Sequence, residues 1–369
     1  MNFSLDEDHI ALRDAAASFL DKEVDLSLLL THGRTVQDSN YDGLWKKIVE
    51  LGWPGIVIPE AFGGLGMDYI DLVMIIGEMG RTLAPAPLFG TLAGAWAIER
   101  AGSAAQKADI LPLIASGERQ VCLAIADASG APGEGVKATP TNGGYTLTGE
   151  KSYVVDADCA DQIVVMGQDD TYYLVDRHAD GVDVSLLPWR DITRQVCSVR
   201  FDDAPAERLE QSGNVWPWVK DRLYLLLAAE SAAGIAAVLA DTVGYANERV
   251  AFGRPIGAFQ SIKHQLAEIA AQSECATAGV QYAAWALSVV DAKAPLAAAM
   301  AQAYASEAYK AATHRNIQVY GAIGFTWEMK NHLYYKRARA NSELLGAPRQ
   351  QREEIVLWLE TDRPAKAAA

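Results

Sequence analysis

A block of short β-prone segments, enclosed on both sides by long helical segments, constrains this chain more than any other feature. The β-prone segments begin near Val121 and return at roughly ten-residue intervals, which is typical of a compact β-barrel or sandwich. We therefore predict an α+β protein with an N-terminal helical domain (1–118), a middle β domain (119–212) and a C-terminal four-helix bundle (213–369). The expected strands are 145–155, 162–166, 172–176, 182–187 and 196–201.

Apolar residues at helical spacing mark the flanking segments. Segment 221–250 contains no proline, and its Gly234 suits close packing against another helix. The Ala-rich tail after Pro364 is expected to be frayed. The N-terminal helices are expected near 10–20, 44–51 and 71–101, with a break at 84–87, and the later C-terminal helices at 259–291, 295–319, 328–345 and 350–360.

The charge of the chain excludes several classes of partner. Its formal net charge of −15 repels phosphate backbones and argues against binding to nucleic acid or to an anionic membrane. The acidic N-terminus, residues 1–8, lacks the pattern of a signal sequence, and no uninterrupted apolar stretch reaches the ~18 residues of a membrane span. We expect a cytoplasmic protein. An anionic ligand such as coenzyme A or a flavin dinucleotide would need a local cluster of cations.

Cysteine and histidine give no sign of a metal or nucleophilic site. The cysteines form no CxxC and no Cys/His set with metal-ligand spacing, so we expect buried free thiols in a reducing compartment and no metal. Ser129-Gly130 lacks the context of a GxSxG nucleophile elbow. The four cysteines are Cys122, Cys159, Cys197 and Cys275, and the six histidines, for which we expect ordinary roles, are His9, His32, His178, His264, His314 and His332.

Two C-terminal motifs carry the groups that a dinucleotide needs. A pyrophosphate requires cationic forks and exposed backbone N–H groups, and an arginine with nearby glycines supplies both. An aromatic ring can cover an adenine or flavin edge, and glutamine amides can donate hydrogen bonds. Alternatively, the arginine is a surface cation and the glycines only cap helices. The candidate cofactor-binding residues are Arg249, Phe252, Gln260, Gln318, Gly321 and Gly324.

Several motifs, in order along nearly the whole chain, resemble those of acyl-CoA dehydrogenases. The resemblance implies the three-part fold, an FAD cofactor, an acyl-CoA substrate and electron-transferring flavoprotein as acceptor. It also implies that the six candidate residues clamp a flavin held mainly by a neighbouring subunit, and therefore an oligomer. The motifs are 51–55, 59–60 and 63–66 in the N-terminal loop, 149–151 with Tyr153 and 156–157 in the β domain, 249–256 with 259–260, and 318–326.

The chain departs from the family at the catalytic base. The family's α,β-dehydrogenation needs a carboxylate that removes the α-proton while the β-hydrogen leaves as hydride to the flavin. Most members carry a Glu in the loop before the last helix, where this chain has Leu345. A minority carry it near the start of the long helix before Arg249, where this chain has Leu223. We therefore assign no catalytic residue.

A second departure concerns the contacts to the flavin ring. The family's Thr-Glu-Pro segment corresponds to Ala126-Asp127-Ala128, so a hydroxyl that would bind the ring is absent. On the next strand the family's Thr is Val155 and its usual Trp is Tyr153. The half-site that this subunit would use for its own flavin ring is thus depleted. The half-site that it would lend to a neighbour is intact.

Three interpretations remain open. In the first, the chain is the non-base subunit of a heteromeric enzyme, similar to the two-subunit dehydrogenases of actinobacterial steroid side-chain degradation, and forms a heterotetramer with a homologous subunit. In the second, a homo-oligomer uses an unusual base, either Glu230 in its apolar helix or Glu343 near the expected loop, although a salt bridge or a solvated helix end would explain each. In the third, the chain is a flavin-free scaffold.

Overall fold

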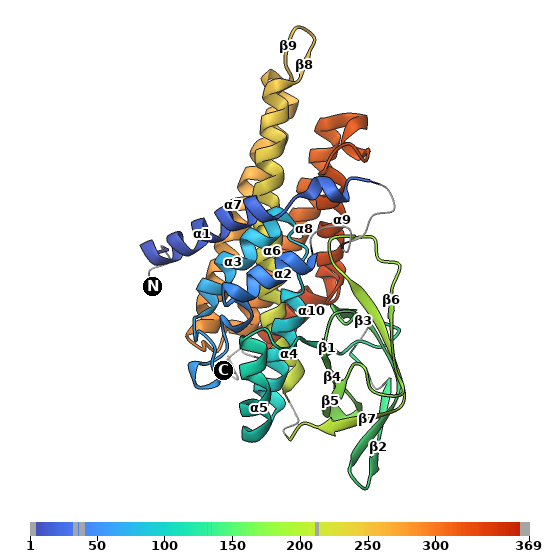
Figure 1. The fold of residues 1–369 in the computed structure, drawn as a ribbon. Coiled ribbons are helices and arrows are strands. Elements are labelled where there is room, and N and C mark those ends of the chain that lie inside the picture. Colours follow the sequence, from blue (N-terminus) through green and yellow to red (C-terminus); the bar gives the residue numbers. More distant parts are fainter. Residues whose placement is uncertain are drawn as a thin grey trace. The chain divides into compact units, whose positions relative to one another are not determined.

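The computed structural model describes residues 5–31, 36, 41–130, 132–133, 135–210 and 214–361. The tail after Pro364 and His32 lie outside these residues. Helices, then strands, then helices follow one another along the chain as predicted (Figure 1), while the domain boundaries near 118 and 212 remain predictions. Two compact units are present, one made of 1–33, 69–84 and 221–369, the other of 34–68 and 85–220.

The first unit is helical, and α8 lies at its centre, packed against α7, α9 and α10. The predicted C-terminal helices are confirmed to within a few residues at most ends. α6 begins six residues before the expected start, and its first residues, up to Lys220, belong to the second unit. The helices are α1 (Glu7–Glu23), α3 (Tyr69–Thr82), α6 (Val215–Glu248), α7 (Gln260–Ser288), α8 (Ala294–Tyr320), α9 (Asn331–Glu343) and α10 (Pro348–Thr361).

Small residues allow α6 to approach its neighbours closely. A Cβ at Gly234 would lie 2.4 Å from Cζ of Tyr309 on α8, and a Cβ at Gly80 on α3 would lie 2.5 Å from Cα of Glu230. The expectation for Gly234 is thereby confirmed. Among the described residues, α6 is the one helix long and apolar enough to cross a membrane, with a mean hydropathy of 1.9. The 18-residue window of α6 that has this hydropathy is 72% buried inside the protein, as expected of a core helix.

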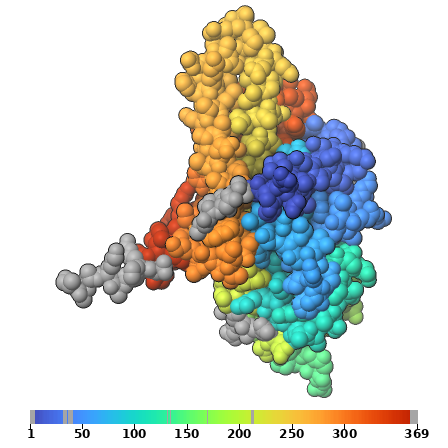
Figure 2. All heavy atoms as spheres, turned by 90° about the vertical axis from the view of Figure 1, so that its left-hand side faces the viewer, coloured from blue at the N-terminus to red at the C-terminus, as the bar shows by residue number. Residues whose placement is uncertain are grey.

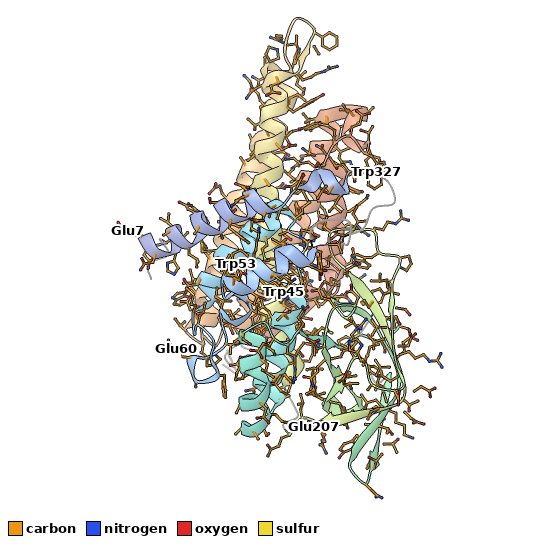
Figure 3. All side chains as sticks on the ribbon, in the orientation of Figure 1. Glu7, Trp45, Trp53, Glu60, Glu207 and Trp327 are labelled. Atoms are coloured by element: carbon orange, nitrogen blue, oxygen red, sulfur yellow. The ribbon has the colours of Figure 1, made fainter. Side chains whose placement is uncertain are left out.

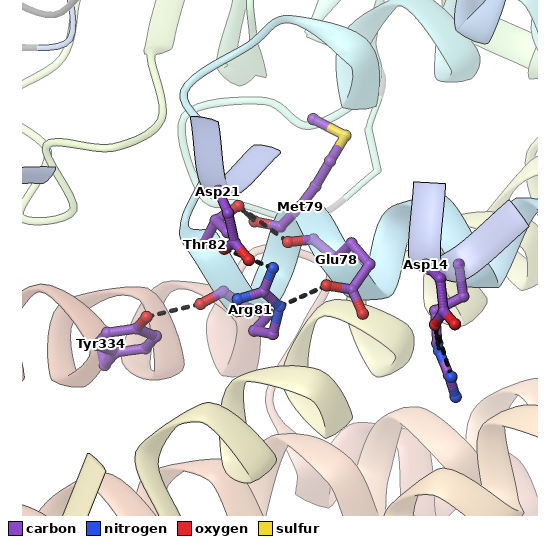
Figure 4. A network of polar contacts seen from close by, with 8 residues as sticks. Asp14, Asp21, Glu78, Met79, Arg81, Thr82 and Tyr334 are labelled. Carbon is purple, nitrogen blue, oxygen red and sulfur yellow. Dashed lines mark hydrogen bonds and ion pairs between the residues drawn. The ribbon is translucent and has the colours of Figure 1, made fainter. Parts of the chain in front are cut away.

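Arg81 links three helices of this unit (Figure 4). Its guanidinium donates to Asp21 Oδ1 of α1 at 2.8 Å and to Glu78 of its own helix. Its backbone carbonyl accepts a hydrogen bond of 2.6 Å from the hydroxyl of Tyr334 on α9. These contacts fix α1 and α9 against α3.

The second unit is built on a seven-stranded sheet in the order β1-β4-β5-β7-β3-β2, with β6 beside β7. β1 and β4 are parallel, and the other pairs are antiparallel. The long strand β7 pairs with β3 along most of its length, with β6 over Cys197–Phe201 and with β5 at its end. The strands are β1 (Val121–Ala124), β2 (Val136–Thr141), β3 (Gly144–Val155), β4 (Gln162–Met166), β5 (Tyr172–Asp176), β6 (Val182–Leu186) and β7 (Val196–Arg208).

Helices and a loop complete this unit. α4 (Leu88–Ala101) packs on β1 and β4, and α5 (Ala104–Ala115) packs on α4. Trp45 of α2 (Tyr41–Glu50) and Trp53 of the 51–55 motif are buried (Figure 3). Trp53, Pro54 and Gly55 of that motif are buried, whereas Leu51 is exposed.

All four cysteines are free, as expected. Cys122 and Cys197 are buried, and burial raises the pKa of Cys197 to about 12, so its thiol stays protonated. Cys159 is half-buried, with Sγ 3.3 Å from the Tyr41 hydroxyl. The expectation of burial is wrong for Cys275, which is exposed on α7, because the sequence does not show which side of a long helix faces solvent.

Candidate functional site

A short hairpin at the end of α6 presents two of the candidate residues. β8 (Val250–Ala251) and β9 (Arg254–Pro255) are joined by Phe252-Gly253, and both turn residues have positive φ, 54° and 80°. A two-residue turn of this kind favours Asn-Gly, so a phenylalanine there is strained. The Phe252 side chain is 95% exposed. A strained and exposed aromatic ring indicates a role in binding rather than in stability.

Arg249 lies at the base of this hairpin. Its backbone N–H donates to Tyr245 O at 2.9 Å and its carbonyl accepts from Ile256 N at 2.8 Å, so both main-chain groups are fixed. Its side chain is exposed and has no ion-pair or hydrogen-bond partner within the described part of the chain. By contrast, Arg254 lies over the Phe259 ring at 4.2 Å. The Arg249 guanidinium is therefore available to an anion.

Gln260 lies at the same end of the unit. It is the first residue of α7, and it follows a short 3-10 turn, Ile256–Ala258, that starts where the hairpin ends. The Gln260 side chain is exposed. In Figures 1 and 2 the end of α6, the hairpin and the start of α7 extend past the ends of α8 and α9.

The glycine-rich motif follows α8 as a 3-10 turn, Gly321–Phe325. Gly321 has φ 70° and ψ −148°, a conformation that glycine alone adopts readily, and a Cβ there would meet nothing within 4 Å. Gly324 differs, because a Cβ there would lie 2.7 Å from Tyr320 Cβ. Packing within the chain thus explains Gly324, while Gly321 keeps open backbone. Gln318 is exposed on the last turn of α8.

The two motifs are brought together by the ends of α6 and α8. The rings of Tyr245 and Tyr320 stack with centroids 3.9 Å apart. Arg249 lies one helical turn beyond Tyr245, and Gly321 directly follows Tyr320. The fold therefore places the arginine and the open glycine at one end of the helical unit.

Leucines occupy both places where the resemblance to acyl-CoA dehydrogenases predicts a base. Leu223 on α6 is buried. Leu345 is partly buried and packs, together with Ile355, against Tyr224 and the start of α8. Neither side chain can accept a proton.

The two alternative carboxylates have structural partners. Glu230 is buried, with Oε2 3.6 Å from Arg337 Nη1 and accepting a hydrogen bond of 3.1 Å from Asn341 Nδ2. The Glu343 side chain is 41% exposed and lies 3.4 Å from Arg339. A buried ion pair thus accounts for Glu230. The sequence could not identify Arg337 as its partner, because the two residues are more than a hundred positions apart.

The structure explains Lys151 of the β-domain motif 149–151 by its contacts within the chain. Lys151 is fully buried, and its Nζ donates to the carbonyls of Ile125 and Gly133 at 2.9 and 2.8 Å. Burial lowers the pKa of Lys151 to about 8, with the Asp127 carboxylate opposing that shift. The lysine holds the loop that includes Ala126-Asp127-Ala128. Asp127 itself accepts from Ser129 N–H and Oγ, which closes a turn and lowers the pKa of the carboxylate.

A bulge in β3 turns Tyr153 out of the sheet. The register of β3 against β7 shifts between Lys151 and Val154, and Tyr153 has φ 57°. Its exposed ring meets Trp189 edge to face at 6.3 Å. Val155 is buried and offers no hydroxyl. Sequence reasoning missed Trp189, which lies in an irregular segment after β6 and carries no motif.

Comparison with known proteins decides the family. The family described as "Acyl-CoA dehydrogenase, N-terminal domain" matches residues 6–118, and "Acyl-CoA dehydrogenase, C-terminal domain" matches 222–359. The acyl-CoA dehydrogenase IpdE2 of Mycobacterium tuberculosis is 32% identical over 95% of this chain and 98% of its own length. The chain belongs to the acyl-CoA dehydrogenase family. It is accordingly an oxidoreductase of the class that acts on CH–CH bonds.

Solved structures of this family share the whole fold. The ChsE4-ChsE5 complex from Mycobacterium tuberculosis is 26% identical with a TM-score of 0.87, covering 99% of this chain and 100% of that chain. A steroid acyl-CoA dehydrogenase variant, Tcur3481-Tcur3483, is 28% identical with a TM-score of 0.84, covering 96% and 98%. The names of both structures combine two different proteins.

Proposed function

We propose that this chain is the non-base subunit of a heteromeric, FAD-dependent acyl-CoA dehydrogenase that carries out α,β-dehydrogenation of an acyl-CoA thioester. The reaction removes the α-hydrogen as a proton and the β-hydrogen as a hydride. The observation that carries the proposal is the pair of apolar residues, Leu223 and Leu345, at both expected base positions. The base then comes from a homologous partner subunit.

FAD, when bound, supplies the hydride acceptor. The residues of this chain that fit the cofactor lie at the α6 end: Arg249 for the pyrophosphate, the exposed ring of Phe252, and the open backbone of Gly321. Arg249 would also offset the repulsion that a dinucleotide meets from a chain of net charge −15. The amides of Gln260 and Gln318 are further donors at this end. Gly324 completes the proposed set by shaping the turn.

The same chain is poorly equipped for a flavin ring of its own. Ala126-Asp127-Ala128 offers no free hydroxyl, Val155 is apolar and buried, and Tyr153 faces Trp189. We therefore propose that this subunit contributes its cofactor-binding residues to the flavin site of a partner subunit, which is the lent half-site. The assembly is a heterotetramer of two unlike pairs.

The relatives support a proposal for the setting of the reaction. One protein of the same fold is a steroid acyl-CoA dehydrogenase, Tcur3481-Tcur3483, and another is the ChsE4-ChsE5 complex. We place the enzyme in steroid or lipid side-chain β-oxidation in the cytoplasm, with electron-transferring flavoprotein as acceptor.

The test compares the chain purified alone with the chain co-expressed with a homologous dehydrogenase subunit. Alone it should be colourless or should fail to bleach added flavin with acyl-CoA, and the complex should be yellow and bleach rapidly. General-base catalysis contributes ~10²–10⁴-fold, which is the expected deficit of the isolated chain.

Rapid bleaching by the isolated chain would contradict the proposal. Glu230→Gln and Glu343→Gln would then identify the base of a self-sufficient homo-oligomer. A complex that assembles without flavin would instead favour a scaffold.

A further inference from the structure

The ends of α6 and α8 are joined by an aromatic stack with a hydrogen bond. Tyr245 and Tyr320 lie with centroids 3.9 Å apart and ring planes 13° from parallel. The Tyr320 hydroxyl donates to Asp241 Oδ2 at 2.8 Å, one turn before Tyr245 on α6. Burial and the bond to the Asp241 carboxylate raise the pKa of Tyr320, so this donor keeps its proton.

The contacts among Tyr245, Tyr320 and Asp241 form a junction between α6 and α8, and buried amides extend this junction to α9. Asn316 Nδ2 donates to Thr242 Oγ1 at 2.8 Å, and Asn331 Nδ2 donates to Asn316 Oδ1 at 2.6 Å. All three side chains are at least 98% buried. Lys330 Nζ lies 3.5 Å from Asp241 Oδ1 and closes the junction from the exposed side. These buried hydrogen bonds join the three helix ends, and Asn331 Oδ1 is the one amide oxygen among these groups that is buried without a hydrogen-bond partner in the described part of the chain.

The junction contacts the proposed cofactor residues directly. Tyr245 O accepts the backbone N–H of Arg249 at 2.9 Å. Tyr320 precedes Gly321, and its Cβ would lie 2.7 Å from a Cβ added at Gly324. The relative position of Arg249 and Gly321 is therefore set by the Tyr245–Tyr320 stack.

We propose that Tyr245 and Tyr320 are positioning residues that hold Arg249 and Gly321 in register for the dinucleotide of the partner's site. The inference rests on the function proposed above. A planar guanidinium fork and an open backbone can bind one pyrophosphate together only if their separation is fixed beforehand. Neither tyrosine needs to touch the cofactor.

The experiment removes FAD from the heteromeric complex and then measures the dissociation constant for added FAD. Flavin fluorescence is the readout, at a temperature well below unfolding. Tyr245→Leu, which removes the stack, should weaken FAD binding roughly three- to tenfold. Tyr245→Phe keeps the ring and should restore wild-type affinity. Tyr320→Phe keeps the stack but loses the Asp241 bond, and should give a smaller loss.

Thr313→Ala is the matched control. Thr313 is fully buried on α8, one turn before Asn316, and its hydroxyl bonds the carbonyl of Tyr309 within its own helix. It should lower the melting temperature without changing FAD affinity. Hydrogen exchange of the FAD-free complex provides a second readout: Tyr245→Leu should speed exchange in 321–325, and Thr313→Ala should not.

The outcomes separate this inference from the proposed function. If Arg249→Ala leaves FAD binding unchanged, both the lent site and the positioning role are overturned. If Arg249→Ala weakens binding while Tyr245→Leu does not, the positioning role alone is overturned. The positioning role alone is also overturned if Thr313→Ala weakens FAD binding as much as Tyr245→Leu does. If the inference holds, the double variant Arg249→Ala/Tyr245→Leu loses less affinity than the two single losses predict together.

Discussion

At the scale of single residues, Arg249 carries the proposed contact with the cofactor. A charge-assisted hydrogen bond is worth about 1.5–3 kcal/mol, so Arg249→Ala should weaken flavin retention in the complex by roughly one to two decades. Arg249→Lys should restore binding only in part, because a point charge does not reproduce a planar fork. Equilibrium dialysis of FAD from the three complexes measures both effects. An unchanged flavin content in Arg249→Ala would leave Arg249 as a solvated helix cation.

His332 should make the chain sensitive to acid. It is buried, Lys336 Nζ donates to its Nδ1 at 3.2 Å, and the centroid of the Trp327 ring lies 4.5 Å from that of the imidazole. Trp327 is labelled in Figure 3. Burial, with Lys336 adding to it, lowers the pKa of His332 to about 4 from its usual 6.5. Between pH 6.5 and 4 the unfolded chain binds the extra proton, so stability is present above pH 6.5 and is lost as the pH falls.

The acid effect can be isolated by substitution. Between pH 7 and 5 the wild type should lose about 2 kcal/mol of unfolding free energy through this group, and His332→Gln should lack that part of the decline. Urea unfolding of both proteins at the two pH values measures it. Parallel declines would show that His332 does not titrate abnormally.

The sequence predicted those candidate site residues that belong to a recognisable motif. Arg249 and Gly321 could be grouped because the motifs occur in order, and the structure brings them to one end of the helical unit. The Tyr245–Tyr320 stack and the Glu230–Arg337 pair could not be predicted, because they depend on the rotation of helices far apart in sequence. Trp189 gave no signal at all.

At the scale of elements, the end of α7 is strained. Val290 has φ 54° and is 86% exposed, at the position after the helix cap where glycine is usual. Its N–H donates to Leu287 O, and Asp291 N–H donates to Ala286 O at 2.9 Å, which completes the helix-ending motif. A β-branched residue pays for this left-handed conformation with roughly 1–2 kcal/mol of strain.

Val290→Gly should therefore stabilise the chain by about 0.5–1 kcal/mol, after the greater freedom of glycine in the unfolded chain is subtracted. Val289→Gly is the matched control, since Val289 has φ −91° and gains nothing from glycine. Thermal unfolding should show a higher melting temperature for Val290→Gly and no gain for Val289→Gly. Equal shifts of the two variants would mean that the backbone at Val290 is not strained.

The elements themselves followed from the sequence where patterns were clean. β4 and β5 match the predicted strands 162–166 and 172–176 residue for residue. β2 was missed because Pro140 interrupts it, which the structure tolerates on an edge strand. The early start of α6 has a similar cause, since Pro217 is acceptable within the first turn of a helix.

At the scale of the whole molecule, the family and the order of helices and strands were predictable, and the assembly was not. The sequence predicts which half of a flavin site is depleted, because Ala126 and Val155 stand where the family has Thr side chains beside the flavin ring. It does not show where a partner's residues lie. The closed two-fold assembly with a second subunit remains a proposal, which the exposed Phe252 and the available Arg249 at one end of the helical unit support.

The most direct test of the shared-site account is the ratio of FAD to protein in the complex co-purified with the homologous subunit. Absorbance gives the flavin content, and native mass spectrometry gives the subunits present. We predict one FAD for each pair of unlike chains in a heterotetramer, because this chain lends a half-site and lacks the ring contacts for a second flavin. One tightly bound FAD per copy of this chain, purified alone as a monomer, would contradict the account.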